Sequence, residues 1–377
     1  MKHGTVFLIA AATAFSLLGD QALYAVLPVL FDELGLAAVE VGVLLSANRW
    51  IRLLTNELAH RVARRAASRS LFAVALLLGS ATTVTYVWTS SFAILLAARL
   101  AWGLAWSFIR HLGVGAVMSG VPASDAGQTM GVFNGISRAG SVAGLFGGAV
   151  LVDLIGFHRA LLVLAAVSLL AIPLAVVGYR DREPSAGELK HAALPWTLVL
   201  MGASLGAVGP GFVMSTLGAA LELRLESSFA AATSLTGLLL ATRYLFDSVA
   251  APLLGGSFDR WGFARCVGLY FGLGGSMLLV ASRVPDALHF ASCVLGFFVC
   301  VTALQAGLAA RASRLGSGAY ARYVTASDLG SAAGPLVGWA IVGATSRPSV
   351  VIGLGGALFI LTSAVAPFVR SPGALES

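Results

Sequence analysis

The chain of 377 residues is 58% hydrophobic and only 11% charged, and its mean hydropathy is +0.89. A soluble domain needs far more charge to cover its surface, so this composition excludes a soluble domain and indicates a chain surrounded by lipid. The net charge of +7 does not indicate nucleic-acid binding, because the basic residues lie in short stretches between apolar runs.

Apolar runs long enough to span a membrane follow one another along the whole chain. The first begins directly after the N-terminus and contains Asp20, without a small-residue cleavage site, so we interpret it as a first span and not as a cleaved signal. The sequence predicts an all-α membrane protein with twelve transmembrane helices, at about 5–30, 39–60, 70–89, 92–117, 127–152, 158–178, 196–221, 229–254, 264–281, 287–310, 323–345 and 349–369.

Basic residues are distributed unevenly over the connecting segments. If the N-terminus lies inside, the inner segments contain 14 Lys and Arg residues and the outer loops four. Positive residues favour the cytoplasmic side, so we expect both termini in the cytoplasm and an even number of spans. The predicted location is a bacterial-type inner membrane. The three cysteines show no metal-ligand spacing, and they predict neither a disulfide nor a metal site.

The most polar internal stretch, 180–191, lies on the inner side near the middle of the chain. Such a stretch between two apolar halves is typical of a linker. We therefore predict an N-terminal six-helix bundle at 1–179, a cytoplasmic linker at 180–194 and a C-terminal six-helix bundle at 195–377.

A basic loop motif occurs after the second run and again after the eighth. Residues 255–265 read G-G-S-F-D-R-W-G-F-A-R, and residues 56–65 read N-E-L-A-H-R-V-A-R-R. Both resemble the G-x-x-x-D-R-x-G-R-R loop of the major facilitator superfamily, although His60 stands where the second copy has Asp259. Such a carboxylate can face a helix N-terminus while the arginines hold the cytoplasmic helix ends together. A conformational role is expected for Arg61, Arg64, Arg65, Asp259 and Arg260; a positive-inside anchor alone is the alternative.

Glycine stripes also occur in both halves. Residues 140–148 read G-S-V-A-G-L-F-G-G and residues 330–338 read G-S-A-A-G-P-L-V-G. They resemble the superfamily's G-x-x-x-G-P-x-x-G-G pattern, which sits in helix 5 of drug–proton antiporters; here Pro335 is in helix 11 and Leu145 replaces it in helix 5. Gly144, Gly334 and Pro335 are therefore expected to take part in conformational switching, with plain close packing as the alternative.

Two further matches extend the resemblance over nearly the whole chain. Arg99-Leu-Ala-Trp-Gly103 resembles the superfamily's R-x-x-x-G motif, and Leu18-Gly19-Asp20 followed by Leu27-Pro28 resembles its helix 1 pattern. The resemblance implies two pseudo-symmetric six-helix bundles around a central cavity, closest to the drug/metabolite–proton antiporter branch. It implies no cofactor, with the proton gradient as the energy source.

Charges within the predicted spans are the most informative residues, because each is costly in lipid unless it faces a cavity or a partner. Asp20 lies about ten residues, or ~15 Å, from the outer end of its run. Arg49 and Arg99 lie at similar depth, so either is a candidate partner for Asp20. A carboxylate whose arginine partner changes between states is a proton switch; a permanent structural ion pair is the alternative.

Arginines outnumber acids in the predicted spans. Arginine stays protonated, and its planar fork suits carboxylate or phosphate, so the surplus favours a cavity for a small organic anion. The spacing i, i+3, i+7 places three polar residues on one face of helix 2, and i, i+4 places two on one face of helix 8. The expected substrate-binding residues are Arg49, Arg52, Asn56, Arg99, Arg138, Arg243 and Asp247.

We expect a secondary transporter that moves a small organic anion by alternating access and is coupled to protons through Asp20. Both export and uptake of the anion are compatible with the sequence. Resemblance to the efflux branch favours export. A multidrug exporter of lipophilic compounds is the first alternative, an uptake symporter the second, and a non-transporting receptor, supported only by His60, the third. No nucleotide-binding motif, nucleophile triad or metal cluster indicates an enzyme. The expected partners are the lipid bilayer and a small anionic molecule, without nucleic acid, and the chain is expected to be a monomer.

Overall fold

The computed structural model describes residues 2–66, 69–118, 121, 125–179, 195–225 and 229–368. The predicted linker at 180–194 lies outside these residues. Helix is the only regular secondary structure in the described part of the chain, in agreement with the predicted all-α class.

The helices of the first half follow the predicted apolar runs closely. They are α1 (Lys2–Leu30), α2 (Ala38–Ala66), α3 (Arg69–Trp88), α4 (Phe92–Met118), α5 (Ala126–Val142), α6 (Gly148–Ile155), α7 (Phe157–Ser168) and α8 (Ala171–Gly178). A π-helical turn, η1 (Ala143–Gly147), joins α5 to α6. Gly156 ends α6 and begins α7 with φ of 81°, a left-handed conformation that glycine adopts without strain.

The second half shows the same order of long helices. Its elements are α9 (Trp196–Gly206), α10 (Met214–Glu222), α11 (Phe229–Val249), α12 (Ala251–Trp261), α13 (Phe263–Ala281), α14 (Ala287–Arg314), α15 (Ser317–Thr345), α16 (Pro348–Ser363) and the short 3₁₀ turn η3 (Ala366–Phe368). A second π-helical segment, η2 (Ala207–Val213), joins α9 to α10 and contains Pro210, which cannot donate a backbone hydrogen bond.

Nine helical segments of the described chain are long and apolar enough to cross a membrane, or ten if the bent pair α11–α12 counts as one span. The helices α2 and α15 complete the predicted twelve. Both have 29 residues, which is ample for a span, but charged residues such as Arg49, Arg52 and Asp328 lower their hydropathy.

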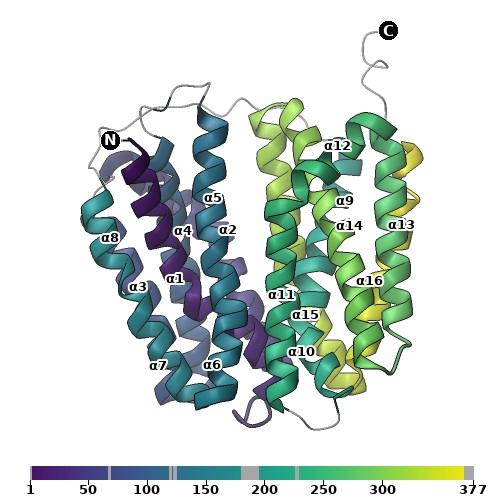
Figure 1. Cartoon of the computed structure of the whole chain (residues 1–377), viewed down its shortest axis with the longest axis horizontal. Helices are drawn as coiled ribbons and strands as arrows, with labels where there is room; N and C mark the ends of the chain where they lie inside the picture. Colours follow the sequence, from purple (N-terminus) through teal and green to yellow (C-terminus); the bar gives the residue numbers. More distant parts are fainter. Residues whose placement is uncertain are drawn as a thin grey trace. The chain divides into compact units, whose positions relative to one another are not determined.

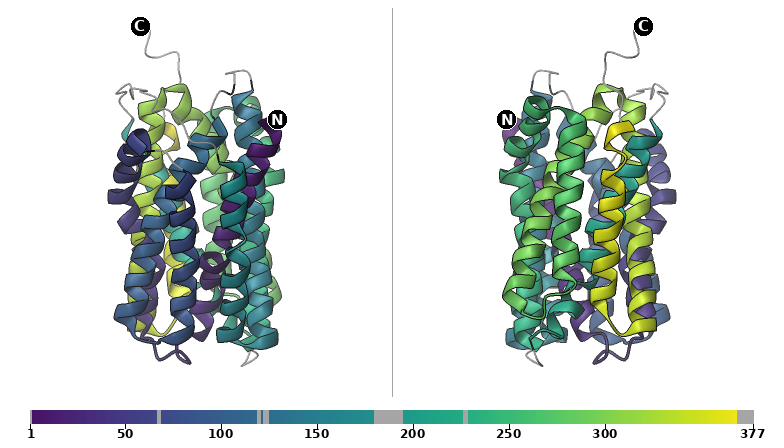
Figure 2. Two further views of the ribbon diagram at one scale, coloured as in Figure 1. Left: turned by 90° about the vertical axis from the view of Figure 1, so that its left-hand side faces the viewer. Right: turned by 90° about the vertical axis from the view of Figure 1, so that its right-hand side faces the viewer.

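The chain forms two compact units, within each of which the helices run lengthwise beside one another (Figures 1 and 2). Unit 1 comprises Met1–Gly187 with Leu225–Tyr244, and unit 2 comprises Glu188–Arg224 with Leu245–Ser377. The first part of α11 thus belongs to unit 1, although it follows the linker in sequence. The predicted boundaries of the two six-helix halves stay a prediction.

Both glycine stripes bring helices into close contact inside their own unit. In unit 1, a β-carbon added at Gly144 would lie 2.6 Å from the carbonyl oxygen of Leu18 in α1. In unit 2, a β-carbon at Gly334 of α15 would lie 2.7 Å from the carbonyl oxygen of Ala207 in η2. These distances leave no room for a side chain, so the stripes allow backbones to approach closely, as small residues do in membrane helix pairs.

Candidate functional site

The centre of unit 1 contains a buried ion pair between α1 and α4. Nη1 of Arg99 donates to Oδ1 of Asp20, and the side chains are only 1% and 5% exposed. The helix-packing glycines keep α1 within the bundle, where Asp20 points toward α4. The predicted partnership of these two residues is therefore present in the structure, while their roles in transport stay a prediction.

The other donor groups of Arg99 form hydrogen bonds with Leu44 and Tyr24. Its Nε donates to the backbone carbonyl of Leu44 in α2 over 2.9 Å, and its Nη2 donates to the hydroxyl of Tyr24 over 3.3 Å. The guanidinium carbon also lies 5.5 Å from the centre of the Tyr24 ring. A buried arginine needs several hydrogen-bond acceptors, because every unpaired N–H donor in a low-dielectric interior costs free energy.

The Asp20 carboxylate also accepts hydrogen bonds from two amide side chains. Nδ2 of Asn48 lies 3.4 Å from Oδ1, and Nε2 of Gln21 lies 3.0 Å from Oδ2. Asn48 and Tyr24 are further joined by hydrogen bonds of 3.2 and 3.4 Å. Sequence reasoning missed Gln21, Tyr24 and Asn48. The spacing of Tyr24, one helical turn after Asp20, is a signal that could have found it.

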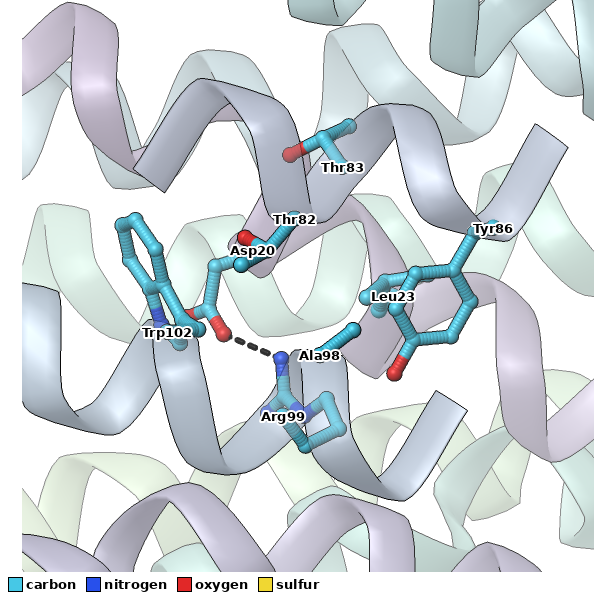
Figure 3. A pocket seen from close by; sticks show the side chains of 8 residues that line it. All are labelled: Asp20, Leu23, Thr82, Thr83, Tyr86, Ala98, Arg99 and Trp102. Atoms are coloured by element: carbon cyan, nitrogen blue, oxygen red, sulfur yellow. Dashed lines mark hydrogen bonds and ion pairs between the residues drawn. The ribbon is translucent and has the colours of Figure 1, made fainter. Parts of the chain in front are cut away.

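A small cavity of about 10 Å³ lies beside the ion pair, between α1, α3 and α4. Figure 3 shows Tyr86 reaching from α3 with its hydroxyl directed toward α4, where Arg99 is bonded to Asp20. The lining residues are Asp20, Leu23, Thr82, Thr83, Tyr86, Ala98, Arg99 and Trp102.

The predicted polar face of α2 begins next to this network. The guanidinium carbon of Arg49 lies 5.3 Å from the centre of the Tyr24 ring. Arg52 and Asn56 follow on α2, and all three side chains are partly exposed. Partial exposure leaves these groups accessible to a solute, and the proximity to Tyr24 connects the α2 face to the buried pair.

A second group of arginines lies on α5 and on the first part of α11, within unit 1. The guanidinium carbons of Arg138 and Arg243 lie 6.0 and 5.8 Å from the centre of the Tyr244 ring. Arg243 is 4% exposed, whereas Arg138 and Tyr244 are partly exposed. Two guanidinium groups on one ring concentrate positive charge, the property expected of an anion-binding site.

Asp247, the remaining predicted binding residue, lies in unit 2. Its Oδ1 accepts a hydrogen bond of 2.7 Å from the hydroxyl of Thr302 in α14. In unit 1, another acid is bonded in a similar way: Asp153 of α6 accepts from the hydroxyl of Ser234 in α11. Both carboxylates are partly exposed, and each accepts a hydrogen bond from a hydroxyl group.

The two copies of the basic loop make different contacts. Asp259 accepts a hydrogen bond of 3.2 Å from Nη2 of Arg314 at the end of α14, and Arg260 is exposed in the last turn of α12. In the first copy, the His60 ring lies 6.1 Å from that of His111 in α4, while Nε of Arg61 lies 2.6 Å from Glu57. The side chains of Arg64 and Arg65 lie outside the described residues.

No group of three or more potential ligand residues is positioned to hold a metal ion in the part of the chain that the structure describes. The described network contains hydroxyl, amide, guanidinium and carboxylate groups, without the nucleophile–base pair of a hydrolase.

Two solved transporters have a similar fold. The nucleoside transporter NupG has a TM-score of 0.77 at 12% identity, covering 98% of this chain and 100% of its own. A bacterial homologue of the human lysosomal transporter Spinster, in an inward-facing and occupied conformation, has a TM-score of 0.74 at 16% identity, covering 97% and 93%. Identities this low show the fold alone. No curated protein matches the sequence.

The sequence profile described as Major Facilitator Superfamily matches residues 9–208, more than half of the chain. This match covers the helices that hold Asp20, Arg49, Arg99 and Arg138, and it agrees with the fold of the similar structures. The likeness confirms the predicted superfamily, while the antiporter branch stays a prediction. The chain therefore belongs to the Major Facilitator Superfamily and is a multi-pass membrane transporter rather than an enzyme.

Proposed function

We propose that the protein is a proton-coupled transporter that exports a small organic anion by alternating access, with Asp20 as the residue that takes up and releases the proton. The observation that supports this proposal is the buried ion pair of Asp20 and Arg99. A charged pair removed from solvent is costly to bury and is stable only while both partners are present. Protonation of Asp20 neutralises one partner and therefore changes the stability of this arrangement strongly.

The bonds of Arg99 explain how the pair can open without unfolding the bundle. When Asp20 is protonated, Arg99 keeps its charge and retains the Leu44 carbonyl and the Tyr24 hydroxyl as acceptors. Its interaction with the carboxyl group weakens from an ion pair to a hydrogen bond between a charged donor and a neutral acceptor. A proton thus shifts the balance between two arrangements of α1 and α4, which is the energetic requirement for coupling.

The substrate class follows from the surplus of guanidinium groups. Arg138 and Arg243 lie over Tyr244, and Arg49 lies over Tyr24, so positive charge and aromatic faces occur together. We assign the carboxylate or phosphate of the substrate to Arg138 and Arg243, and we assign its remaining contacts in unit 1 to Arg49, Arg52 and Asn56. A role in substrate binding for Asp247 of unit 2 stays a prediction. A lipophilic cation would be repelled by the same groups, which argues against the multidrug alternative.

Uptake by symport is the second candidate, and one observation favours it. A protonated Asp20 leaves the charge of Arg99 uncompensated, so a proton and an anion stabilise each other's binding in unit 1. Export rests on the resemblance of the glycine stripe to the antiporter branch. The two candidates require opposite directions of proton movement relative to the solute.

Reconstituted protein can test the substrate class and the direction together. Proteoliposomes containing a pH-sensitive dye would be challenged with citrate, succinate, adenosine monophosphate, uridine and ethidium. We expect proton movement with one or more of the anions and none with ethidium. For a given direction of anion movement, antiport and symport change the luminal pH in opposite directions. Proton movement with ethidium alone would overturn the proposal. Comparison of metabolites in culture medium with and without the gene would then identify the natural solute.

We also propose that both termini lie in the cytoplasm of a bacterial-type inner membrane and that the transporter acts as a monomer without a cofactor. The distribution of Lys and Arg over the loops supports this orientation. A green fluorescent protein fused to the C-terminus should fluoresce, whereas an alkaline phosphatase fusion should be inactive there. An active phosphatase would contradict the orientation.

A further inference from the structure

We propose that the cavity between α1, α3 and α4 is a binding site for one water molecule, held by the hydroxyl of Tyr86 beside the Asp20–Arg99 pair. Tyr86 is then a positioning residue for that pair. Water binding in this cavity is independent of the transported solute, but its effect on coupling rests on the proposed function of Asp20.

The hydroxyl of Tyr86 provides the first argument. The side chain is only 3% exposed, and its hydroxyl has no hydrogen-bond partner among the described residues. Burial of an unsatisfied hydroxyl costs about 1–3 kcal/mol. Figure 3 shows this hydroxyl at the cavity, directed away from α3. The geometry therefore places an unpaired donor and acceptor where a small polar molecule can reach it.

The size of the cavity selects the molecule. Its volume of about 10 Å³ is at the lower limit of the roughly 10–15 Å³ that one water requires. A buried water also needs two to four polar partners, and the lining supplies Asp20, Thr82, Thr83, Tyr86 and Arg99. An organic anion or a phosphate is too large for this space.

The charges of the lining exclude a metal cation. The one carboxylate, Asp20, is already compensated by Arg99, whose guanidinium faces the same cavity. A sodium or calcium ion would therefore meet a net neutral site that includes a positive neighbour. A neutral molecule that both donates and accepts hydrogen bonds fits this lining, because it can satisfy Tyr86 without adding charge.

The position of this water gives it a role in coupling. Hydrogen bonds from a water solvate the Asp20 carboxylate when Arg99 moves away, and so lower the cost of separating the pair. Without Tyr86 to hold it, the water would be less ordered and the pair harder to separate. We thus expect Tyr86 to affect the rate of proton-coupled exchange without being required for solute binding.

Infrared difference spectroscopy of the reconstituted protein can detect the water directly. Spectra in normal water and in water labelled with oxygen-18 distinguish the O–H band of a buried water from that of a tyrosine. We expect an isotope-sensitive band in the wild type that is lost in Tyr86→Phe. The matched control is Tyr270→Phe, whose buried hydroxyl already pairs with Ser257 over 2.9 Å and whose loss should leave the band in place.

A second variant separates the water from the hydroxyl. Ala98→Val keeps Tyr86 but fills the cavity, and it should lose the same band. Thermal unfolding provides an independent test. If the Tyr86 hydroxyl is bonded to a water, Tyr86→Phe should be less stable than the wild type. If the hydroxyl has no partner, the variant should be as stable as the wild type or more stable. An unchanged band in both variants, with equal or higher stability of Tyr86→Phe, would overturn the proposal.

Transport measurements distinguish failure of this proposal from failure of the proposed function. With the anion that gives the largest signal among citrate, succinate and adenosine monophosphate, Tyr86→Phe should slow proton-coupled flux several-fold and leave anion affinity unchanged. If Asp20→Asn retains full coupling while Tyr86→Phe loses the band, the water site stands and the role of Asp20 is wrong. If Asp20→Asn loses coupling while Tyr86→Phe keeps the band, the water site is wrong.

Discussion

The two units bury polar groups of different kinds. In unit 1, the buried polar set includes Asp20, Gln21, Asn48, Arg99 and Arg243. Among the described residues of unit 2, the buried polar side chains other than tyrosine, tryptophan and cysteine are all hydroxyl residues: Thr197, Ser204, Ser215, Thr216, Ser257, Thr302, Ser331 and Thr362. Unit 1 thus has a charged interior, and unit 2 has a neutral one.

The two units share the features that pack their helices, and they differ in buried charge. Both units contain a glycine stripe against a neighbouring helix, and both satisfy buried hydroxyls locally, for example Ser204 with Thr362 over 2.8 Å. A bundle of this kind therefore packs well without buried charge. The ion pair of unit 1 is an additional cost, which argues that Asp20 and Arg99 serve transport.

The largest effect is expected from Arg99→Ala. Removing one partner leaves the Asp20 carboxylate buried and uncompensated, a change that typically costs about 3–5 kcal/mol. We expect low yield of folded protein and loss of coupled transport, measured by thermal unfolding in detergent and by flux in proteoliposomes. The double variant Asp20→Asn with Arg99→Ala should recover much of the stability. Equal instability of the single and double variants would show that charge burial is not the cause.

Glycine substitutions test the similarity between the units. Gly144→Ala and Gly334→Ala place a β-carbon 2.6 Å and 2.7 Å from a carbonyl oxygen, and each should destabilise the protein by about 1–3 kcal/mol. Gly147→Ala is the control, since nothing lies within 4 Å of its added β-carbon. The measurement is the midpoint of thermal unfolding. A destabilised control, or tolerance in only one unit, would contradict equal packing roles.

A neutral pair in unit 2 should matter less than the ion pair of unit 1. Ser204→Ala with Thr362→Val removes both partners of one hydrogen bond, so we expect a loss of about 0.5–1.5 kcal/mol. Transport should keep its pH dependence, as measured by flux at several pH values. A changed pH dependence would show that unit 2 also contributes to coupling and would weaken the comparison.

The smallest expected effect lies at the start of α14, outside the spans. The backbone N–H of His289 donates to Asp286 and holds the pKa of this carboxyl below its usual value. A lowered pKa means that the contribution to stability is complete above about pH 3.9, the value of an unfolded chain, and is lost as the pH falls through the folded value. Asp286→Asn should remove this dependence in unfolding measurements across that range. An unchanged acid dependence in the variant would contradict the assignment.

Hydrophobicity and motif spacing predicted the helices and the superfamily, because lipid imposes length and apolar character on every span. The same reasoning narrowed the partner of Asp20 to two arginines at similar depth. It did not distinguish Arg99 from Arg49, since both lie at the same level and only the rotation of α2 and α4 places Arg99 on the carboxylate.

Other parts of the site depend on packing that spacing does not specify. Tyr24 and Asn48 join the network through side-chain contacts between α1 and α2, and Tyr86 reaches it from α3, far away in the sequence. The π-helical segments at Gly144 and Pro210 also followed no visible periodicity. They add a residue to a turn and thereby change which side chains face inward.

The central claim is that the charge of Asp20 couples the proton gradient to transport. Its most direct test is Asp20→Asn in proteoliposomes, with the best-transported anion of the tested panel and an imposed pH gradient. We predict that the variant still exchanges this anion across the membrane but no longer accumulates it in response to the gradient. The control Asp153→Asn, which alters an acid that accepts a hydrogen bond from the hydroxyl of Ser234, should remain coupled. Gradient-driven accumulation by Asp20→Asn at the wild-type level would contradict the claim.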